Sequence, residues 1–244
     1  MGERNRVVSI RGAGSVSGGA YERISIYGSG SVHGDLEAFA VRVWGSGEFE
    51  SDVQVREMVV RGAGEVTGTL RASRLRSAGA LQVKGELQGG DIKTMGALTC
   101  GGALQAETFR MRGAFTIGGL LAADHVEIYL GGPCHAEEIG GARIEVHPRT
   151  AGGNRSISEA ITRLFGTVRT DRRLTATVIE GDEVRLERTT AAVVRGRNVS
   201  IGADCRIDRV EYRDHLELHP SAEVTELHRL DAGHGAPIHH QTES

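Results

Sequence analysis

The fold is decided by a short unit that reads V-R-V-W-G-S-G-E-F at residues 41–49 and M-V-V-R-G-A-G-E-V at residues 58–66. The unit recurs along the first half of the chain, and its first glycine marks the period. That glycine falls at Gly12, Gly28, Gly45, Gly62, Gly79, Gly96 and Gly113. The first step is 16 residues and every later step is 17. A period of this length predicts a solenoid, in which each repeat forms one coil and stacks on the next.

Apolar residues recur at fixed distances from this glycine. Four residues after it stand Val16, Val32, Phe49, Val66, Val83, Cys100 and Ile117, and one further step of 17 reaches Cys134. Four residues before it stand Val8, Ile24, Val41, Met58, Leu75, Ile92, Phe109 and Val126. Eight residues after it stand Ala20, Leu36, Val53, Leu70, Leu87, Leu104 and Leu121. Each coil therefore supplies apolar side chains from three places, as three short strands around a triangular core require.

The local rhythm indicates strands, because Val41-Arg42-Val43 alternates apolar and polar residues with the period of two. We therefore predict an all-β, single-stranded parallel β-helix with coils of about 17 residues, interrupted by a short helical excursion. The repeating glycines are expected at corners, where the backbone needs φ > 0 or has little room for a side chain.

The repeat divides the chain into four segments. Glycine-rich coils are predicted over 1–148, and further coils over 175–230. An inserted loop over 149–174 is expected to carry a short helix, because Ser156 and Glu159 form a capping box and Gly166 could end the helix. The last segment, 231–244, has no period and is expected to be disordered. In the second set of coils the predicted columns are Val184, Ile201 and Leu218; Thr190, Ile207 and Val224; and Val193, Val210 and Leu227.

Composition argues against several classes of function. The net charge is −3 and no long run of Lys or Arg occurs, so neither nucleic acid nor anionic lipid is an expected partner. The sequence shows no leader and no long apolar stretch, which favours a cytoplasmic protein without membrane insertion. The three cysteines lie far apart and form no C-x-x-C pair. We expect reduced thiols, with Cys100 and Cys134 acting as packing residues.

Motifs that could carry chemistry are weak. The stretch Gly12–Gly18 reads G-x-G-x-x-x-G, but it recurs with the repeat and no helix is expected after it, so it is not a nucleotide loop. His215, Glu217 and His219 would share one outer strand face and could hold a metal, although a solvated face is the favoured interpretation. Carboxylates occur one or two per coil, without a clear catalytic pair. The sequence therefore predicts no catalytic, metal or cofactor site, and the protein is expected not to be an enzyme.

The glycine-punctuated windings resemble those of the bactofilins, the polymer-forming cytoskeletal proteins of bacteria. The resemblance is carried by residues 26–35, 60–68, 178–182 and 193–202, and it covers most of residues 7–227. It implies a right-handed triangular β-helix that polymerises end to end into filaments without nucleotide. It also implies a scaffolding role in cell shape, motility or the positioning of other proteins.

Three hypotheses follow. The first is a self-assembling cytoplasmic scaffold, whose partners are other copies of itself and other cytoskeletal or envelope-associated proteins. Assembly would use the end coil, with Val8, Ile10 and Val16, because an open strand edge recruits further strands. The second is a capped β-helix that binds a carbohydrate or a protein ligand along one face. The third is an enzyme similar to the hexapeptide acyltransferases.

Overall fold

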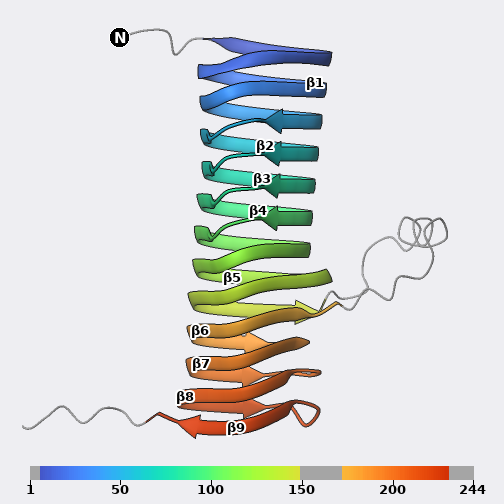
Figure 1. Ribbon diagram of the computed structural model, residues 1–244. Helices are drawn as coiled ribbons and strands as arrows, with labels where there is room; N and C mark the ends of the chain where they lie inside the picture. Colours follow the sequence, from blue (N-terminus) through green and yellow to red (C-terminus); the bar gives the residue numbers. More distant parts are fainter. Residues whose placement is uncertain (1–5, 149–171, 231–244) are drawn as a thin grey trace, which may run out of the picture.

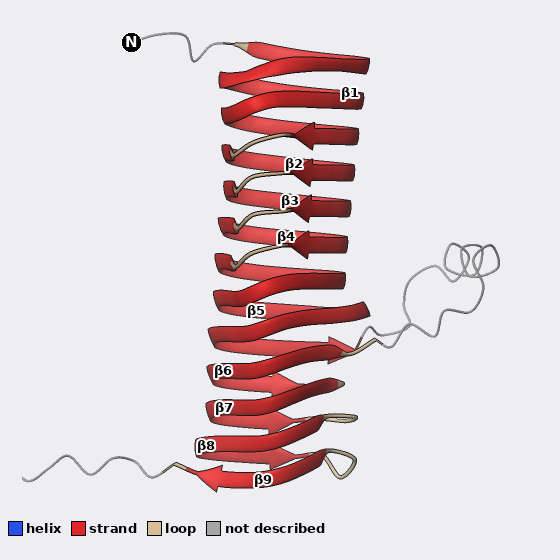
Figure 2. Cartoon of the chain, viewed as in Figure 1, coloured by secondary structure: helices blue, strands red, loops and turns tan. Residues whose placement is uncertain are grey.

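The chain forms a rod of stacked β-coils in a computed structural model that describes residues 6–148 and 172–230 (Figure 1). Every regular element in these residues is a strand (Figure 2). The strands are β1 (Val7–Phe49), β2 (Val53–Val66), β3 (Leu70–Val83), β4 (Leu87–Cys100), β5 (Leu104–Pro148), β6 (Leu174–Leu186), β7 (Thr189–Ile201), β8 (Arg206–Leu218) and β9 (Glu223–Arg229).

These strands form one sheet in the order of the sequence, β1 to β9, and each strand pairs in parallel with the next. The first coil of β1 lies at one end of the rod and β9 lies at the other (Figure 1). The prediction of a parallel β-solenoid is confirmed. The predicted helix and the predicted disordered tail fall in 149–171 and 231–244, outside the described residues.

Identical positions of the repeat lie directly above one another. Phe49 pairs with Val66, Val66 with Val83, Val83 with Cys100, and Cys100 with Ile117. These five side chains are almost completely buried, as are Val32 and Cys134. At the N-terminal end of the rod burial is incomplete, because a coil is missing on one side. The core therefore runs as a continuous apolar column along the rod.

The repeat also carries a core position that sequence reasoning assigned to a corner. The third motif position holds Gly47 and Gly64 in early coils and Leu81, Leu98 and Phe115 in later ones, all in one register. These residues face inward, and Phe115 packs edge to face on Phe109 with 5.9 Å between ring centroids. The corner assignment of this glycine is wrong, because the backbone there alternates as an ordinary strand and φ is not positive.

The first glycine of the motif is a true corner. It has positive φ in all seven repeats, from 80° at Gly12 to 148° at Gly113. A second constraint comes from stacking. A Cβ atom built on Gly62 would lie 2.2 Å from the carbonyl oxygen of Gly45 in the coil above. Only glycine therefore satisfies both the turn and the close approach of consecutive coils.

This stacking predicts a difference between two glycine-to-alanine changes. Gly34 also has positive φ (92°), but an added Cβ would meet nothing within 4 Å. Gly34→Ala should cost roughly 1–2 kcal/mol for the backbone conformation alone. Gly62→Ala should cost clearly more, because the coils must also move apart. Urea unfolding of both variants measures the difference, and equal losses would contradict a steric role for the glycine ladder.

The lower coils are shorter than the sequence period suggested. Val184 pairs with Val199, 15 residues later, and Ile201 pairs with Leu186. The predicted columns are therefore wrong at their first member, whereas Ile201 with Leu218, Ile207 with Val224 and Val210 with Leu227 are correct. Corners here use Arg188 and Asp204, with φ of 49° and 57°, instead of glycine. Without a glycine to fix the phase, a uniform period of 17 was applied one coil too early.

Candidate functional site: the two ends of the rod

The first coil presents apolar side chains at the N-terminal end of the rod. Ile10 is still 8% exposed and Val8 and Val16 are half-buried, whereas Val32 and Val41 in inner coils are fully buried. Val7 lies on the outer side of the strand and is 59% exposed. The partial exposure of Val8 and Val16 follows from the lack of a described coil above them, so the apolar column ends at an open surface.

The backbone at this end is paired on one side. The carbonyl oxygen of Arg6 accepts hydrogen bonds from the backbone N–H groups of Glu22 (3.0 Å) and Arg23 (3.4 Å) in the next coil. The first coil of β1 is also the outermost in the sheet order of the described residues. A terminal strand of a sheet carries N–H and C=O groups directed away from the sheet, which are available to another strand.

The C-terminal end is open in a similar way. β9 pairs with the part of β8 from Arg206 to Tyr212, so the end of β8 has no described strand below it. Leu218 is 42% exposed and Leu227 is 49% exposed, while Leu216 and Val224 are half-buried. Sequence reasoning named only the N-terminal coil. The signal for this second end was present, because Leu218, Val224 and Leu227 are the last members of their columns.

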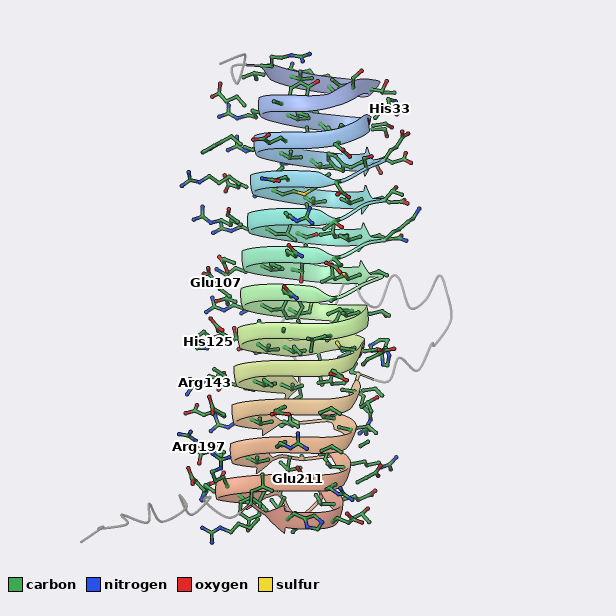
Figure 3. The ribbon with its side chains drawn as sticks, turned by 60° about the vertical axis from the view of Figure 1, so that its left-hand side comes forward. His33, Glu107, His125, Arg143, Arg197 and Glu211 are labelled. Carbon is green, nitrogen blue, oxygen red and sulfur yellow. The ribbon has the colours of Figure 1, made fainter. Side chains whose placement is uncertain are left out.

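The sides of the rod carry ionic contacts between coils. Arg195 lies 2.9 Å from Glu180 in the coil above and 2.7 Å from Glu211 in the coil below. Arg209 pairs with Glu226 at 2.9 Å, and its hydrogen bond is the main cause that lowers the pKa of the Glu226 carboxyl. Figure 3 shows that charged side chains such as Arg143 and Arg197 point outward along the rod. The sides therefore differ in character from the apolar ends.

The histidine cluster on β8 is not brought together as a metal site. His215 Nε2 lies 3.4 Å from a Glu217 oxygen, while His219 Nδ1 accepts a hydrogen bond from the backbone N–H of Ser221. Within residues 6–148 and 172–230 no group of three potential metal ligands occurs. The three residues lie on a solvated strand face, which the sequence interpretation favoured.

Two grooves cross the coils on the sides of the rod. One spans β1 to β5 and is lined by residues including Tyr21, Phe39, Arg56 and Asp91. Phe39 is 53% exposed, and the Arg56 guanidinium lies 5.4 Å from the centre of its ring. The other groove lies lower and includes Arg195 among its lining residues. These grooves are the places where the ligand-binding hypothesis would apply.

All three cysteines are free and buried. The thiol of Cys100 lies 3.4 Å from the carbonyl oxygen of Gly85, and that of Cys134 lies 3.6 Å from the carbonyl oxygen of Gly113. Burial raises the pKa of each thiol, and it raises the pKa of Cys134 to about 12. Since the thiolate is the reactive form, slow labelling of the native protein by thiol reagents is expected.

The raised pKa of Cys134 also predicts a dependence of stability on pH. An unfolded cysteine ionises near pH 8.5, whereas the folded Cys134 holds its proton up to about pH 12. Stability is therefore full below about pH 8.5 and should fall as the pH rises, by at most about 1.4 kcal/mol per pH unit from this residue. Chemical denaturation at several pH values, with Cys134→Val as the comparison, measures this contribution. An identical alkaline loss in both proteins would contradict it.

The chain is similar to two uncharacterized proteins of Bacillus subtilis strain 168. It is 38% identical to YhbF over 96 residues, which are 39% of this chain and 35% of YhbF. It is 51% identical to YhbE over 51 residues, which are 21% of this chain and 22% of YhbE. The similarity thus spans about a third or less of these relatives. No family model and no solved structure matches the chain.

The part of the chain that the structure describes contains no helix long and apolar enough to cross a membrane.

Proposed function

We propose that this protein is a non-enzymatic scaffold that assembles end to end into filaments without nucleotide, in the manner of the bactofilins that its windings resemble. The observation that supports this proposal is the form of the two ends. Each end has a strand edge with no described neighbour, and each exposes the last members of apolar columns that are fully buried inside the rod.

The two ends have matching chemistry. The N-terminal coil carries Val8 and Ile10, two residues apart on one strand, and the C-terminal end carries Leu216 and Leu218 with the same spacing. Stacking of one end on another would extend the backbone ladder by strand addition. It would also bury side chains that each contribute roughly 1.5–3 kcal/mol when removed from water. Contacts inside the rod are made in the same way, between one coil and the next.

Assembly through the ends fits the distribution of charge. Side chains on the flanks form ion pairs that are half exposed, such as Lys84 with Glu65 at 2.8 Å. Exposed pairs contribute little and weaken in salt. Lateral contacts should therefore be weak, and growth should follow the long axis of the rod. With this proposal we assign the right-handed coil sense of the bactofilins, a cytoplasmic location, and a role in cell shape, motility or the positioning of envelope-associated proteins.

Sedimentation of the purified protein without nucleotide tests the proposal. Apolar end contacts should survive salt, so the same fraction should pellet at about 0.1 M and about 1 M NaCl, although the Debye length falls from about 10 Å to about 3 Å. A protein that stays in the supernatant at both salt concentrations, or that pellets only at low salt, would contradict end-to-end assembly.

A second candidate function is the binding of a carbohydrate or protein ligand on one side of the rod. It is favoured by the groove that crosses β1 to β5, where the exposed ring of Phe39 and the adjacent Arg56 offer a stacking surface. Ligand binding by a single rod that never pellets would support this candidate in place of the scaffold.

A further inference from the structure

Two outward-facing columns run side by side along one face of the rod. Both alternate with buried positions on the same strands, so they point to the same side. We call them the basic strip. The first column is Arg42, Val59, Arg76, Lys93 and Arg110, and the second is Trp44, Arg61, Ala78, Met95 and Arg112, each in direct register from β1 to β5.

The basic strip holds six cations and no acid, although the whole chain has a net charge of −3. Lys93 pairs with Asp91 at 2.9 Å, and Arg110 pairs with Glu127 at 3.0 Å. Arg42, Arg61 and Arg76 form no ion pair with any residue in 6–148 or 172–230. Their positive charge is therefore uncompensated on the strip itself.

Sequence reasoning missed this surface because it looked for runs of Lys and Arg. The cations of the strip are 17 residues apart in the chain and become neighbours only when the coils stack. Strands of a sheet lie about 4.8 Å apart, so the strip is about 20 Å long over its five coils. That exceeds the Debye length of about 8 Å at physiological ionic strength. A nearby ligand therefore responds to the strip more than to the net charge.

Apolar and aromatic groups lie among these cations. Tyr27 stacks on Trp44 with 4.8 Å between ring centroids and 4° between the ring planes. Arg11, from the coil above, lies 6.0 Å from the centre of the Tyr27 ring, and Trp44 is in register with Arg61 of the coil below. The ring faces are thus directed at neighbours along the rod. Met95 adds an apolar side chain that is 53% exposed.

The strip is also bordered by small side chains. The column beside it, beyond the corner glycines, consists of Ser46, Ala63, Ala80, Ala97 and Ala114. All but the last are exposed, and none is large enough to stand above the strip. A broad, flat partner can therefore approach the cations without a steric barrier on that side.

From this arrangement we propose that the basic strip binds the surface of an anionic phospholipid bilayer. A flat sheet face with uncompensated arginines fits a plane of phosphate headgroups. Tyr and Trp rings with their edges outward fit the headgroup level, where an apolar ring and a polar tip are both satisfied. Nucleic acid is a poorer fit, because bases bind by stacking on open ring faces, and the faces of Tyr27 and Trp44 are directed at their neighbours.

This binding mode places the rod lengthwise on the membrane and leaves both ends free. It does not depend on the proposed end-to-end assembly, since the strip lies on the side of a single chain. A monomeric rod should bind the same surface.

Trp44 is the one tryptophan of the chain, so its fluorescence reports directly on the strip. Vesicles of phosphatidylcholine with phosphatidylglycerol should shift the Trp44 emission to the blue and carry the protein in flotation. Vesicles of phosphatidylcholine alone should do neither, and high salt should release the protein. Absence of binding to the anionic vesicles would overturn the proposal. So would tighter binding to a DNA oligonucleotide than to these vesicles.

Charge reversal then locates the surface. The triple variant Arg42→Glu, Arg61→Glu and Arg76→Glu should lower the apparent vesicle affinity by about 100-fold or more. A matched control, Arg56→Glu, Arg71→Glu and Arg206→Glu, makes the same change in net charge on exposed residues outside the strip. The control should keep most of the binding, with circular dichroism unchanged in both variants. An equal loss in both variants would show a response to net charge alone and overturn the assignment.

Discussion

Val66→Asp is expected to unfold the coils around it. Val66 is fully buried and lies between Phe49 above and Val83 below, so the new carboxylate would have apolar neighbours on both sides of the ladder. An unpaired buried charge costs several kcal/mol, or the carboxyl stays protonated through a large rise in its pKa. We expect a loss on the order of 5 kcal/mol in unfolding free energy, measured by urea denaturation followed by circular dichroism.

Val59→Asp provides the control for this substitution. Val59 lies on the same strand as Val66 but faces outward in the basic strip, with Arg42 and Arg76 on either side of it. The same chemical change there should alter stability by less than about 1 kcal/mol. An unchanged midpoint for Val66→Asp, or equal losses for the two variants, would show that the assigned core ladder is wrong.

Val8→Glu combined with Ile10→Glu is expected to stop assembly at the N-terminal end. Both side chains belong to the end coil and point toward the apolar column, so two carboxylates would have to be buried against a second molecule. The inner coils have their own neighbours and should remain folded. Sedimentation should therefore show monomers or dimers in place of long assemblies, with circular dichroism close to that of the parent protein.

Val7→Glu combined with Ser9→Glu is the matched control for the end-coil variant. These two residues are on the same strand and face outward, and the change in charge is identical. The control should still assemble. If the Val8 and Ile10 variant forms assemblies as long as those of the control, growth does not use the N-terminal coil.

The upper coils could be predicted from the sequence because one glycine fixes their phase. The first motif glycine recurs with a nearly constant step, and stacking leaves no room for a side chain at that corner. Counting from it placed Val66 and Met58 on positions that the structure buries completely. The same counting failed in the lower coils. There Arg188 and Asp204 make the corners, and residues other than glycine do not announce a positive φ in the sequence.

The surfaces were harder to predict than the core. A buried position has to be apolar, so a column such as Val43 and Val60 is visible in a linear sequence. Outward positions vary freely, and the basic strip appears only when Arg42, Arg76 and Arg110 are read down the stack. The C-terminal end was missed for a different reason. Whether Leu218 is covered depends on how far β9 extends beneath β8, and no local pattern encodes that length.

Negative-stain electron microscopy of the purified protein, without nucleotide, tests end-to-end assembly most directly. The account predicts unbranched filaments one rod wide, formed at both low and high salt, because the apolar ends stack and the charged sides do not. Separate short rods of uniform length, at concentrations where the protein is otherwise folded, would contradict it.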